Sequence, residues 1–400
     1  MSEPVAIVRC SSYEGAAVAE AVNQALRALG GMEQFVQPGQ KVLLKVNLLS
    51  ASEPERAITT HPAFVEAVAR AVQSVGGQPM IGDSPGGSIR YNDAGLRRVY
   101  RITGMADVAA RTGAELMFDT RSQEVSFPEG KLLKRVEIIQ PARDADVIIS
   151  LPKFKTHVLT TFTGAIKNMF GVIPGAKKPL LHVTPRGLPN FAEMLVDVML
   201  LAKPALTIMD GVVGMEGDGP SAGRPRTVGV VLAGRDGIAI DVIATQIAGI
   251  SPASVPTLQR AAARGLWSGR PEDVPTLATP LSEVILTDFV PPRPNHHPEG
   301  GTGMPAVDRY IAPVLINWLA VKPVPKQGRC TACQTCVRAC PRQAITIPNG
   351  LAIVDYNQCI RCYCCHEMCP ETAIDLEQPW LARLLSLVAP TGGQKKTEAK

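Results

Sequence analysis

The sequence predicts an α/β fold, in which a mostly parallel sheet is covered by helices, followed by a small cysteine-rich α+β domain. Strand and helix patterns alternate over about the first 290 residues, which is typical of a parallel sheet with helices on its faces. Hydrophobic residues make up 46% of the chain but aromatic residues only 4%, so the core is expected to be largely aliphatic. Nine of the ten cysteines lie between Cys330 and Cys369, which indicates a separate small domain.

The elements of the large domain follow from apolar periodicity and from turn residues. Strands are expected where short apolar runs are bounded by glycine, proline or polar residues, at 5–9, 41–49, 79–82, 115–118, 145–151, 206–209 and 227–233. Helices are expected where apolar residues recur at helical spacing, at 16–29, 61–75, 96–112, 163–170, 190–201, 238–248 and 256–264. Thr60 is the expected N-cap of the second helix, because Pro62 suits its first turn. A glycine-rich loop is predicted at 210–223.

Changes in composition predict the domain boundaries. The large domain is assigned to residues 1–290, and a Pro- and Gly-rich linker with one amphipathic helix, at 306–320, to residues 291–328. The cysteine module is assigned to residues 329–376. A helix and a disordered tail are expected at 377–400.

Charge and hydropathy exclude several protein classes. The formal net charge is +5, and no block of basic residues resembles a nucleic-acid-binding arm. No apolar run reaches the ~18–20 residues that span a bilayer, and the first residues lack the features of a signal peptide. We therefore expect a cytoplasmic protein without a transmembrane segment and without a nucleic-acid partner. The oligomeric state is not predicted.

The cysteine module contains an internal repeat. Each copy reads Cys-x2-Cys-x2-Cys-x3-Cys-Pro, once from Cys330 to Pro341 and again from Cys359 to Pro370. Three thiolates at this spacing bind three corners of a 4Fe-4S cubane, and in two-cluster ferredoxins the fourth ligand comes from the other copy. The repeat predicts a bacterial-type ferredoxin domain with two 4Fe-4S clusters, whose binding is coupled to the folding of the module.

Crossed ligation assigns four cysteines to each cluster. Cluster 1 is assigned Cys330, Cys333, Cys336 and Cys369, and cluster 2 is assigned Cys359, Cys362, Cys365 and Cys340. Zinc is the alternative, although zinc spacings usually form two separate knuckles. Cys364 is an extra cysteine, interpreted as a small packing residue, a substitute ligand or a redox thiol.

A basic segment follows the strand at 145–151. If this segment is extended, Lys153, Lys155 and His157 share one face, because strand side chains alternate with period two. They would lie beyond the carboxyl end of a strand, where open α/β sheets bind ligands. The sequence therefore predicts an anion-binding pocket, with a solvated basic loop as the alternative.

A helix that begins near Thr163 would contribute to the same pocket. The free N–H groups at a helix N-terminus favour an anion, and Lys167 and Asn168 lie on the first turns of this helix.

Other polar residues fall at or near strand ends. Each is a candidate binding residue or an ordinary cap or turn residue, and their shared placement favours a common crevice; they are Lys45, Asn47, Asp83, Asp210 and Glu216, with Asp241 early in a helix.

These segments together resemble the domain-of-unknown-function 362 family. The resemblance rests on Lys45–Asn47, Gly82–Gly86, Pro152–His157, Thr163–Asn168 with Phe170–Gly171, Asp210–Gly214 with Glu216–Gly217, and Asp241–Ala244. It covers the large domain, and many members of that family resemble this chain in carrying a C-terminal two-cluster module. The family is also similar in fold to nickel-dependent lactate racemases, but no matching nickel-ligand motif occurs here, so their chemistry is not carried over.

The predicted function is electron transfer, with an iron–sulfur oxidoreductase as the first hypothesis. Electrons would pass from the clusters to a substrate or cofactor in the polar crevice, where lysines hold an anionic group and a histidine moves protons. The candidate catalytic residues are His157, Lys155, Lys167 and His61.

Two alternatives stay open at this point. One is a non-catalytic electron relay that docks a partner enzyme, and the other is a metal- or cofactor-handling protein. The partner is accordingly a redox protein or a small-molecule substrate. The chain has no Walker loop and no dinucleotide fingerprint, whereas a further cofactor of the large domain, such as a flavin, stays open.

Overall fold

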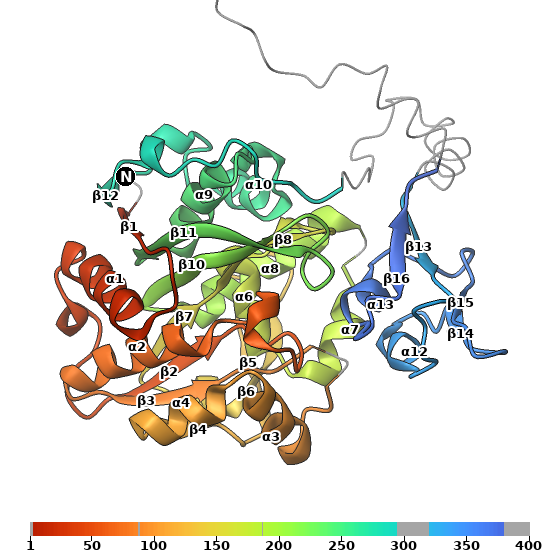
Figure 1. The fold of residues 1–400 in the computed structure, drawn as a ribbon, viewed down its shortest axis with the longest axis horizontal. Helices are drawn as coiled ribbons and strands as arrows, with labels where there is room; N and C mark the ends of the chain where they lie inside the picture. The colour runs from red at the N-terminus through yellow and green to blue at the C-terminus, as the bar shows by residue number, and fades with distance from the viewer. Residues whose placement is uncertain (1–2, 87–88, 186, 294–319, 380–400) are drawn as a thin grey trace, which may run out of the picture.

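The computed structural model describes residues 3–86, 89–185, 187–293 and 320–379. Its large domain is built on one mixed sheet, with the strand order β12-β1-β11-β10-β7-β2-β3-β4 (Figure 1). The run from β10 to β4 is parallel throughout, whereas β11 is antiparallel to both β10 and β1. In chain order these strands are β1 (Val5–Arg9), β2 (Lys41–Val46), β3 (Gln78–Gly82), β4 (Glu115–Leu116), β7 (Val147–Leu151), β10 (Leu206–Glu216), β11 (Arg224–Gly234) and β12 (Thr276–Ala278).

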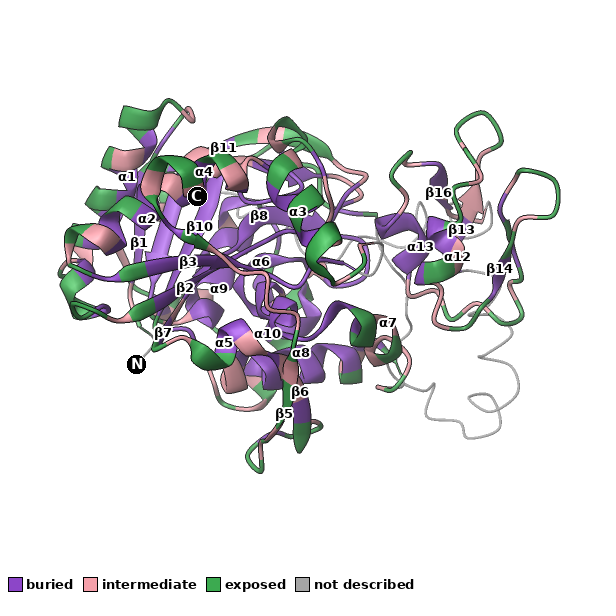
Figure 2. Ribbon diagram, turned by 90° about the horizontal axis from the view of Figure 1, so that it is seen from below, coloured by how far each residue is buried: buried purple, intermediate pink, exposed green. Residues whose placement is uncertain are grey.

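Helices cover the sheet and bury its strands (Figure 2). Alternate residues of β2 enter two different cores: Val42 and Leu44 pack with α1 to α4, whereas Leu43 packs with the core formed by α6, α8, α9 and α10. The helices are α1 (Gly15–Ala28), α2 (Pro62–Ser74), α3 (Asp93–Ile102), α4 (Met105–Thr112), α5 (Gln140–Asp144), α6 (Gly164–Asn168), α7 (Lys178–Leu181), α8 (Leu188–Ala202), α9 (Gly237–Ile247) and α10 (Pro256–Ala263). The predicted class, a mostly parallel helix-covered α/β sheet with a small second domain, is confirmed.

Two predictions about helices were wrong. The helix expected at 96–112 is divided into α3 and α4, because Gly104 takes a left-handed conformation (φ 74°). The N-cap of α2 is His61, whose ring nitrogen accepts the Ala63 N–H. Thr60 instead donates its hydroxyl to the Leu151 carbonyl at 2.7 Å.

The glycine-rich loop expected at 210–223 is mostly strand. β10 continues to Glu216, and β11 begins at Arg224. The extension is stable because β10 pairs with β11 on one side and with β8 (Lys153–His157) on the other, with an irregular register near Gly211. As a result, Asp210 and Glu216 lie at the two ends of a seven-residue stretch of strand and not in one loop.

The small module packs beside α7 at one end of the large domain (Figure 1). Its outer strand β13 (Lys322–Pro325) pairs with β16 (Ile374–Glu377), so the linker predicted for 291–328 overlaps the module. The module also contains β14 (Ile345–Thr346), β15 (Ile353–Val354), α12 (Thr335–Ala339) and α13 (Cys364–Glu367). The helix predicted at 306–320 lies outside the described residues, apart from its last position, and the tail at 380–400 lies wholly outside them.

Two further short pairings complete the large domain. β5 (Ser122–Ser126) and β6 (Arg135–Ile139) form an antiparallel hairpin, and β9 (Thr161–Phe162) pairs with β8. No helix in the described part of the chain is both long and apolar enough to cross a membrane.

Candidate functional site

The cysteines of the module surround two separate cavities. One, with about 310 Å³ of empty space, is lined by Cys330, Cys333, Cys336 and Cys369. The other, with about 340 Å³, is lined by Cys340, Cys359, Cys362 and Cys365. Each cavity therefore takes three thiols from one copy of the repeat and one thiol from the other copy.

The backbone around these cavities repeats as closely as the sequence does. Left-handed non-glycine residues are rare, yet they recur 29 positions apart, in the pairs Ala332 and Arg361 (φ 54° and 55°), Gln334 and Tyr363 (62° and 58°), and Gln343 and Thr372 (52° and 47°). The last cysteine of each copy also accepts an N–H bond at 3.2 Å, from Ala344 to Cys340 Sγ and from Ala373 to Cys369 Sγ. Four thiols with N–H donors to sulfur form a donor set that fits a 4Fe-4S cluster.

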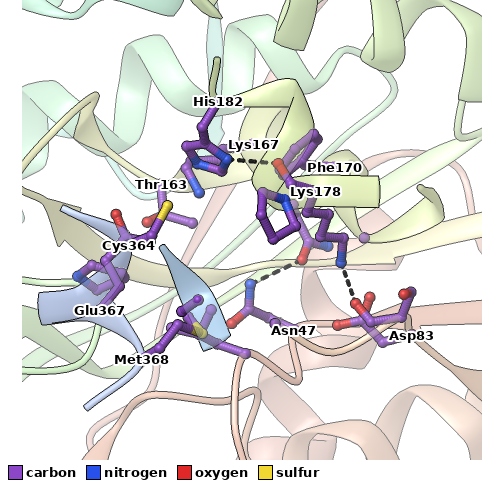
Figure 3. A pocket seen from close by; sticks show the side chains of 18 of the residues that line it. Asn47, Asp83, Thr163, Lys167, Phe170, Lys178, His182, Cys364, Glu367 and Met368 are labelled. Carbon is purple, nitrogen blue, oxygen red and sulfur yellow. Dashed lines mark hydrogen bonds between the residues drawn. The ribbon is translucent and has the colours of Figure 1, made fainter. Parts of the chain in front are cut away.

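A third cavity, the junction pocket, lies where the module meets the large domain (Figure 3). It contains about 700 Å³ of empty space. Figure 3 shows Cys364, Glu367 and Met368 of the module on one side and Asp83 of the large domain on the opposite side. The other polar residues of the large domain in its wall are Asn47, Ser84, Lys155, Thr163, Lys167, Asn168, Lys178 and His182.

Lys155 brings a buried ammonium group to this pocket. Its side chain is 1% exposed, and Nζ donates to Asn47 Oδ1 at 2.9 Å and to the Ile58 carbonyl at 2.6 Å. Both acceptors are neutral, and the charge of Lys155 has no carboxylate partner among the described residues. Burial and the nearby Lys167 ammonium lower the pKa of Lys155 well below its usual value.

Lys45, Asp83 and Asn168 belong to a polar network that reaches Lys155 through Asn47. Lys45 Nζ lies 2.8 Å from Asp83 Oδ1, and Asp83 also accepts the Leu48 N–H at 2.7 Å. Asn168 Oδ1 accepts from the Asn47 amide at 3.2 Å. Lys45 itself does not line the pocket.

Lys167, Lys178 and His182 form another part of the pocket wall. Lys178 donates to the carbonyl of Ser84, and burial lowers its pKa to about 7. His182 Nδ1 lies 2.8 Å from the Lys178 carbonyl, which can only accept, so Nδ1 carries the proton and Nε2 is left as an acceptor. Burial lowers the pKa of His182 to about 4, which keeps it neutral at pH 7. Burial also lowers the pKa of Lys167, whose Nζ has no hydrogen bond or ion pair within the described residues.

His157 supports the pocket wall without lining the pocket. Its Nδ1 accepts the Leu159 N–H at 3.1 Å, so Nε2 carries the proton, and Nε2 lies 3.3 Å from Glu367 Oε1. Burial lowers the pKa of His157 well below its usual value and raises the pKa of Glu367. The Glu367 carbonyl also accepts the Ser221 hydroxyl at 2.7 Å, and these contacts join the module to the large domain.

Two family models match this chain. A model described as "Domain of unknown function (DUF362)" matches residues 42–246, and a 4Fe-4S binding domain matches residues 323–346. The chain belongs to the DUF362 family. The predicted family and the predicted 4Fe-4S module are thereby confirmed.

One relative and one solved structure are also similar. A thylakoid-associated protein of Synechocystis is 39% identical over 262 residues, which cover 64% of this chain and 78% of that protein. The lactate racemase apoprotein from Thermoanaerobacterium thermosaccharolyticum is 13% identical with a TM-score of 0.37, and the match covers 61% of this chain and 56% of the racemase. This second likeness is too weak to support any functional inference.

Three of the candidate site residues lie in another cluster of the DUF362 domain. Lys153 Nζ lies 2.8 Å from Asp210 Oδ2 and 2.7 Å from the Tyr13 hydroxyl. Asp210 also accepts the His61 N–H, and the His61 ring stacks on Tyr13 at 3.6 Å. This closed network satisfies its own charges, and its members do not line the junction pocket.

Two predicted acidic residues have structural partners. Glu216 pairs with Arg224 at 2.7 Å and accepts the Val290 N–H. Asp241 accepts the N–H groups of Ala165 and Ile166 at 2.6 and 3.0 Å. The expectation that the N-terminus of α6 binds a ligand anion was wrong, because Asp241 already occupies it; only the Thr163 side chain reaches the pocket.

Several pocket residues were missed by the sequence reasoning. Lys178 and His182 follow α6 in a region with no recognisable motif, and Ser84 and Glu367 come from distant parts of the chain. Two of them gave a signal: Ser84 lies in the segment Gly82–Gly86 that carries the family resemblance, and Glu367 is an acidic residue between two predicted cluster ligands, Cys365 and Cys369.

The lowered pKa of Lys178 predicts a pH effect on stability. Between the folded pKa of about 7 and the ordinary value of 10.5, the unfolded chain holds a proton that the folded chain releases. The free energy of unfolding therefore gains about 1.4 kcal/mol per pH unit from this group as pH rises across that window. Lys178→Met should remove this slope in chemical denaturation of the intact protein, whereas Lys177→Met, which removes an exposed lysine, should keep it. Equal slopes for wild type and Lys178→Met would contradict the assignment.

Proposed function

We propose that this protein is an iron–sulfur oxidoreductase that passes electrons from two 4Fe-4S clusters to an anionic substrate in the junction pocket. The observation that carries the proposal is the composition of the pocket wall. Cations of the DUF362 domain form one side, and the other side includes Ala339 and Cys364, which adjoin the cluster 2 cysteines Cys340 and Cys365. A molecule in the pocket would lie between a positive surface and a cluster.

The two-cluster assignment is supported by the paired cysteine cavities. Cluster 1 is proposed to bind Cys330, Cys333, Cys336 and Cys369, and cluster 2 to bind Cys359, Cys362, Cys365 and Cys340. When bound, such clusters supply electrons one at a time.

The partners of the buried lysines support the proposal of an anionic substrate. Three lysines of the DUF362 domain are at most 1% exposed, and two of them pair with carboxylates: Lys45 with Asp83 and Lys153 with Asp210. Lys155 has only neutral acceptors. A buried charge is costly unless it is paired, so an anion beside Lys155 would stabilise the pocket. Lys167 would reinforce its binding.

The remaining wall groups suit the positioning of a polar substrate and the delivery of a proton. The hydroxyls of Ser84 and Thr163 are buried and have no hydrogen-bond partner among the described residues, so both can donate to substrate oxygens. Because burial lowers the pKa of Lys167, its ammonium is a better proton donor near neutral pH than an exposed lysine. Neutral His182 offers Nε2 as an acceptor.

The remaining polar residues have a positioning role in this proposal. Lys45, Asp83, Asn47 and Asn168 hold Lys155 in place, and His157 positions Glu367. A relay without chemistry of its own would not need a buried cation without a carboxylate partner beneath its clusters, so the oxidoreductase hypothesis is preferred.

The substrate role of the lysines is testable by single-turnover kinetics. Clusters are reduced with dithionite, the excess is removed, and reoxidation by a panel of unsaturated carboxylates and organic phosphates is followed by visible absorbance. For any anion that reoxidises the wild type, Lys155→Met and Lys167→Met should each slow the reaction ~100-fold or more, because preorganised charge is lost. Iron content should not change.

Lys177→Met, an exposed neighbour of the pocket, is the matched control and should react like the wild type. If both pocket variants retain the wild-type rate, the proposal fails. Loss of iron in them would assign a structural role to the lysines.

Crossed ligation is testable by removing cluster 1 and then determining which cysteine supplies the fourth ligand of cluster 2. Replacing Cys330, Cys333 and Cys336 by serine should leave cluster 2, with about four irons per chain. In that background Cys340→Ser should remove the remaining iron and Cys369→Ser should not. The opposite result would show that each copy of the repeat binds its own cluster.

A further inference from the structure

A second cavity at the domain junction is not used by the proposed reaction. This groove contains about 830 Å³ of empty space, and its wall includes Arg56 and Arg98 of the DUF362 domain. The module contributes Cys333, Arg338 and Cys369. Cys333 and Cys369 also line the cavity of cluster 1, so the groove lies directly against that cluster site.

The groove is positively charged at its surface. Arg56, on the short turn Pro54–Arg56, and Arg98, on α3, are exposed, as is Arg338. None of the three forms an ion pair within the described part of the chain, and Arg338 donates only to the Thr335 hydroxyl at 3.3 Å. Among the described residues that line the groove, Glu367 alone carries a carboxylate, and it is buried against His157.

The exposed arginines of the groove suit a different kind of partner from the buried lysines of the junction pocket. The junction pocket buries its lysines, as a site that encloses a small anion requires, whereas these arginines lie on the surface on separate elements. Exposed charges of one sign mainly steer and orient a charged partner, and they set the rate and salt dependence of association. Electron-transfer encounters are small and weak, and Cys333 is itself exposed. A protein that approaches the groove would therefore reach the edge of the cluster 1 site.

We propose that this groove docks an acidic electron-carrier protein, which reduces cluster 1. The proposal rests on the two-cluster relay described above and adds the side from which electrons enter. In each encounter the carrier loses one electron and cluster 1 gains it, and no bond is made or broken. Cluster 2, beside the junction pocket, is then the exit. Donor and substrate would occupy neighbouring cavities, whose walls share Glu367 and Met368.

The test is a binding measurement on the intact, cluster-loaded protein. Two oxidised probes are used, an acidic plant-type two-iron ferredoxin and a flavodoxin, each labelled for fluorescence anisotropy at ~20 mM and ~200 mM salt. The variant is Arg56→Glu with Arg98→Glu, and the matched control is Arg101→Glu with Arg143→Glu. The control pair changes the net charge equally at exposed arginines outside the groove.

At least one carrier should bind at low salt, and its affinity should be lower at the higher salt. The groove variant should lower this affinity roughly tenfold or more, and the control pair should change the affinity by less than about twofold. Equal loss in both pairs, or no binding of either carrier at low salt, would overturn the proposal. So would tight competition by inorganic pyrophosphate, which would mark the groove as a small-anion site.

Iron content and the spectrum after dithionite reduction are recorded for every variant. If these are unchanged while carrier binding is lost, the docking inference is supported independently of the reaction. If dithionite cannot reduce the wild-type protein, the relay itself fails, which is a different outcome from absent docking.

Discussion

A buried ammonium group costs several kcal/mol unless another charge compensates it, and three lysines of the DUF362 domain are at most 1% exposed. Lys45 and Lys153 are each 2.8 Å from a carboxylate. Lys155 is held by an amide and a backbone carbonyl alone. Lys155 therefore differs from the other two lysines, because no carboxylate of the described residues compensates its charge. The anionic substrate proposed here is the partner that the pocket itself does not provide.

The ferredoxin-like module closes this pocket, and the same short repeat both holds the cluster cysteines and contributes pocket residues. The repeat that surrounds the cysteine cavities also projects Cys364 and Glu367 toward the DUF362 domain. Glu367 meets His157 and Ser221, so the contact that holds the domains together is only two residues from Cys365 and Cys369. Because cluster binding is coupled to folding of such modules, loss of the clusters is expected to loosen the pocket as well.

The fold could be predicted from the sequence because its strongest signals are local. The buried strands β2, β7 and β10 begin as short aliphatic runs, and the cysteine spacing specifies a module by itself. Errors arose where one residue decides a local outcome, as Gly104 does between α3 and α4. The β10 extension was missed because its stability comes from pairing with β8 and β11, which no local pattern reports.

The site was only partly predictable for the same reason. Lys155, Thr163, Lys167 and Asn168 lie close together in sequence and line one pocket. Lys153 was expected beside Lys155 by strand alternation, but the irregular pairing of β8 with β10 leaves it opposite Asp210. Lys178, His182 and Glu367 reach the pocket only through tertiary packing, so their roles could not be read from spacing.

The most direct test of this account is native mass spectrometry of the whole protein purified without oxygen. It weighs every metal and cluster bound to the chain at once. The account predicts a species that carries two 4Fe-4S clusters per chain. Zinc in place of iron, or a fully loaded chain with a single cluster, would contradict it.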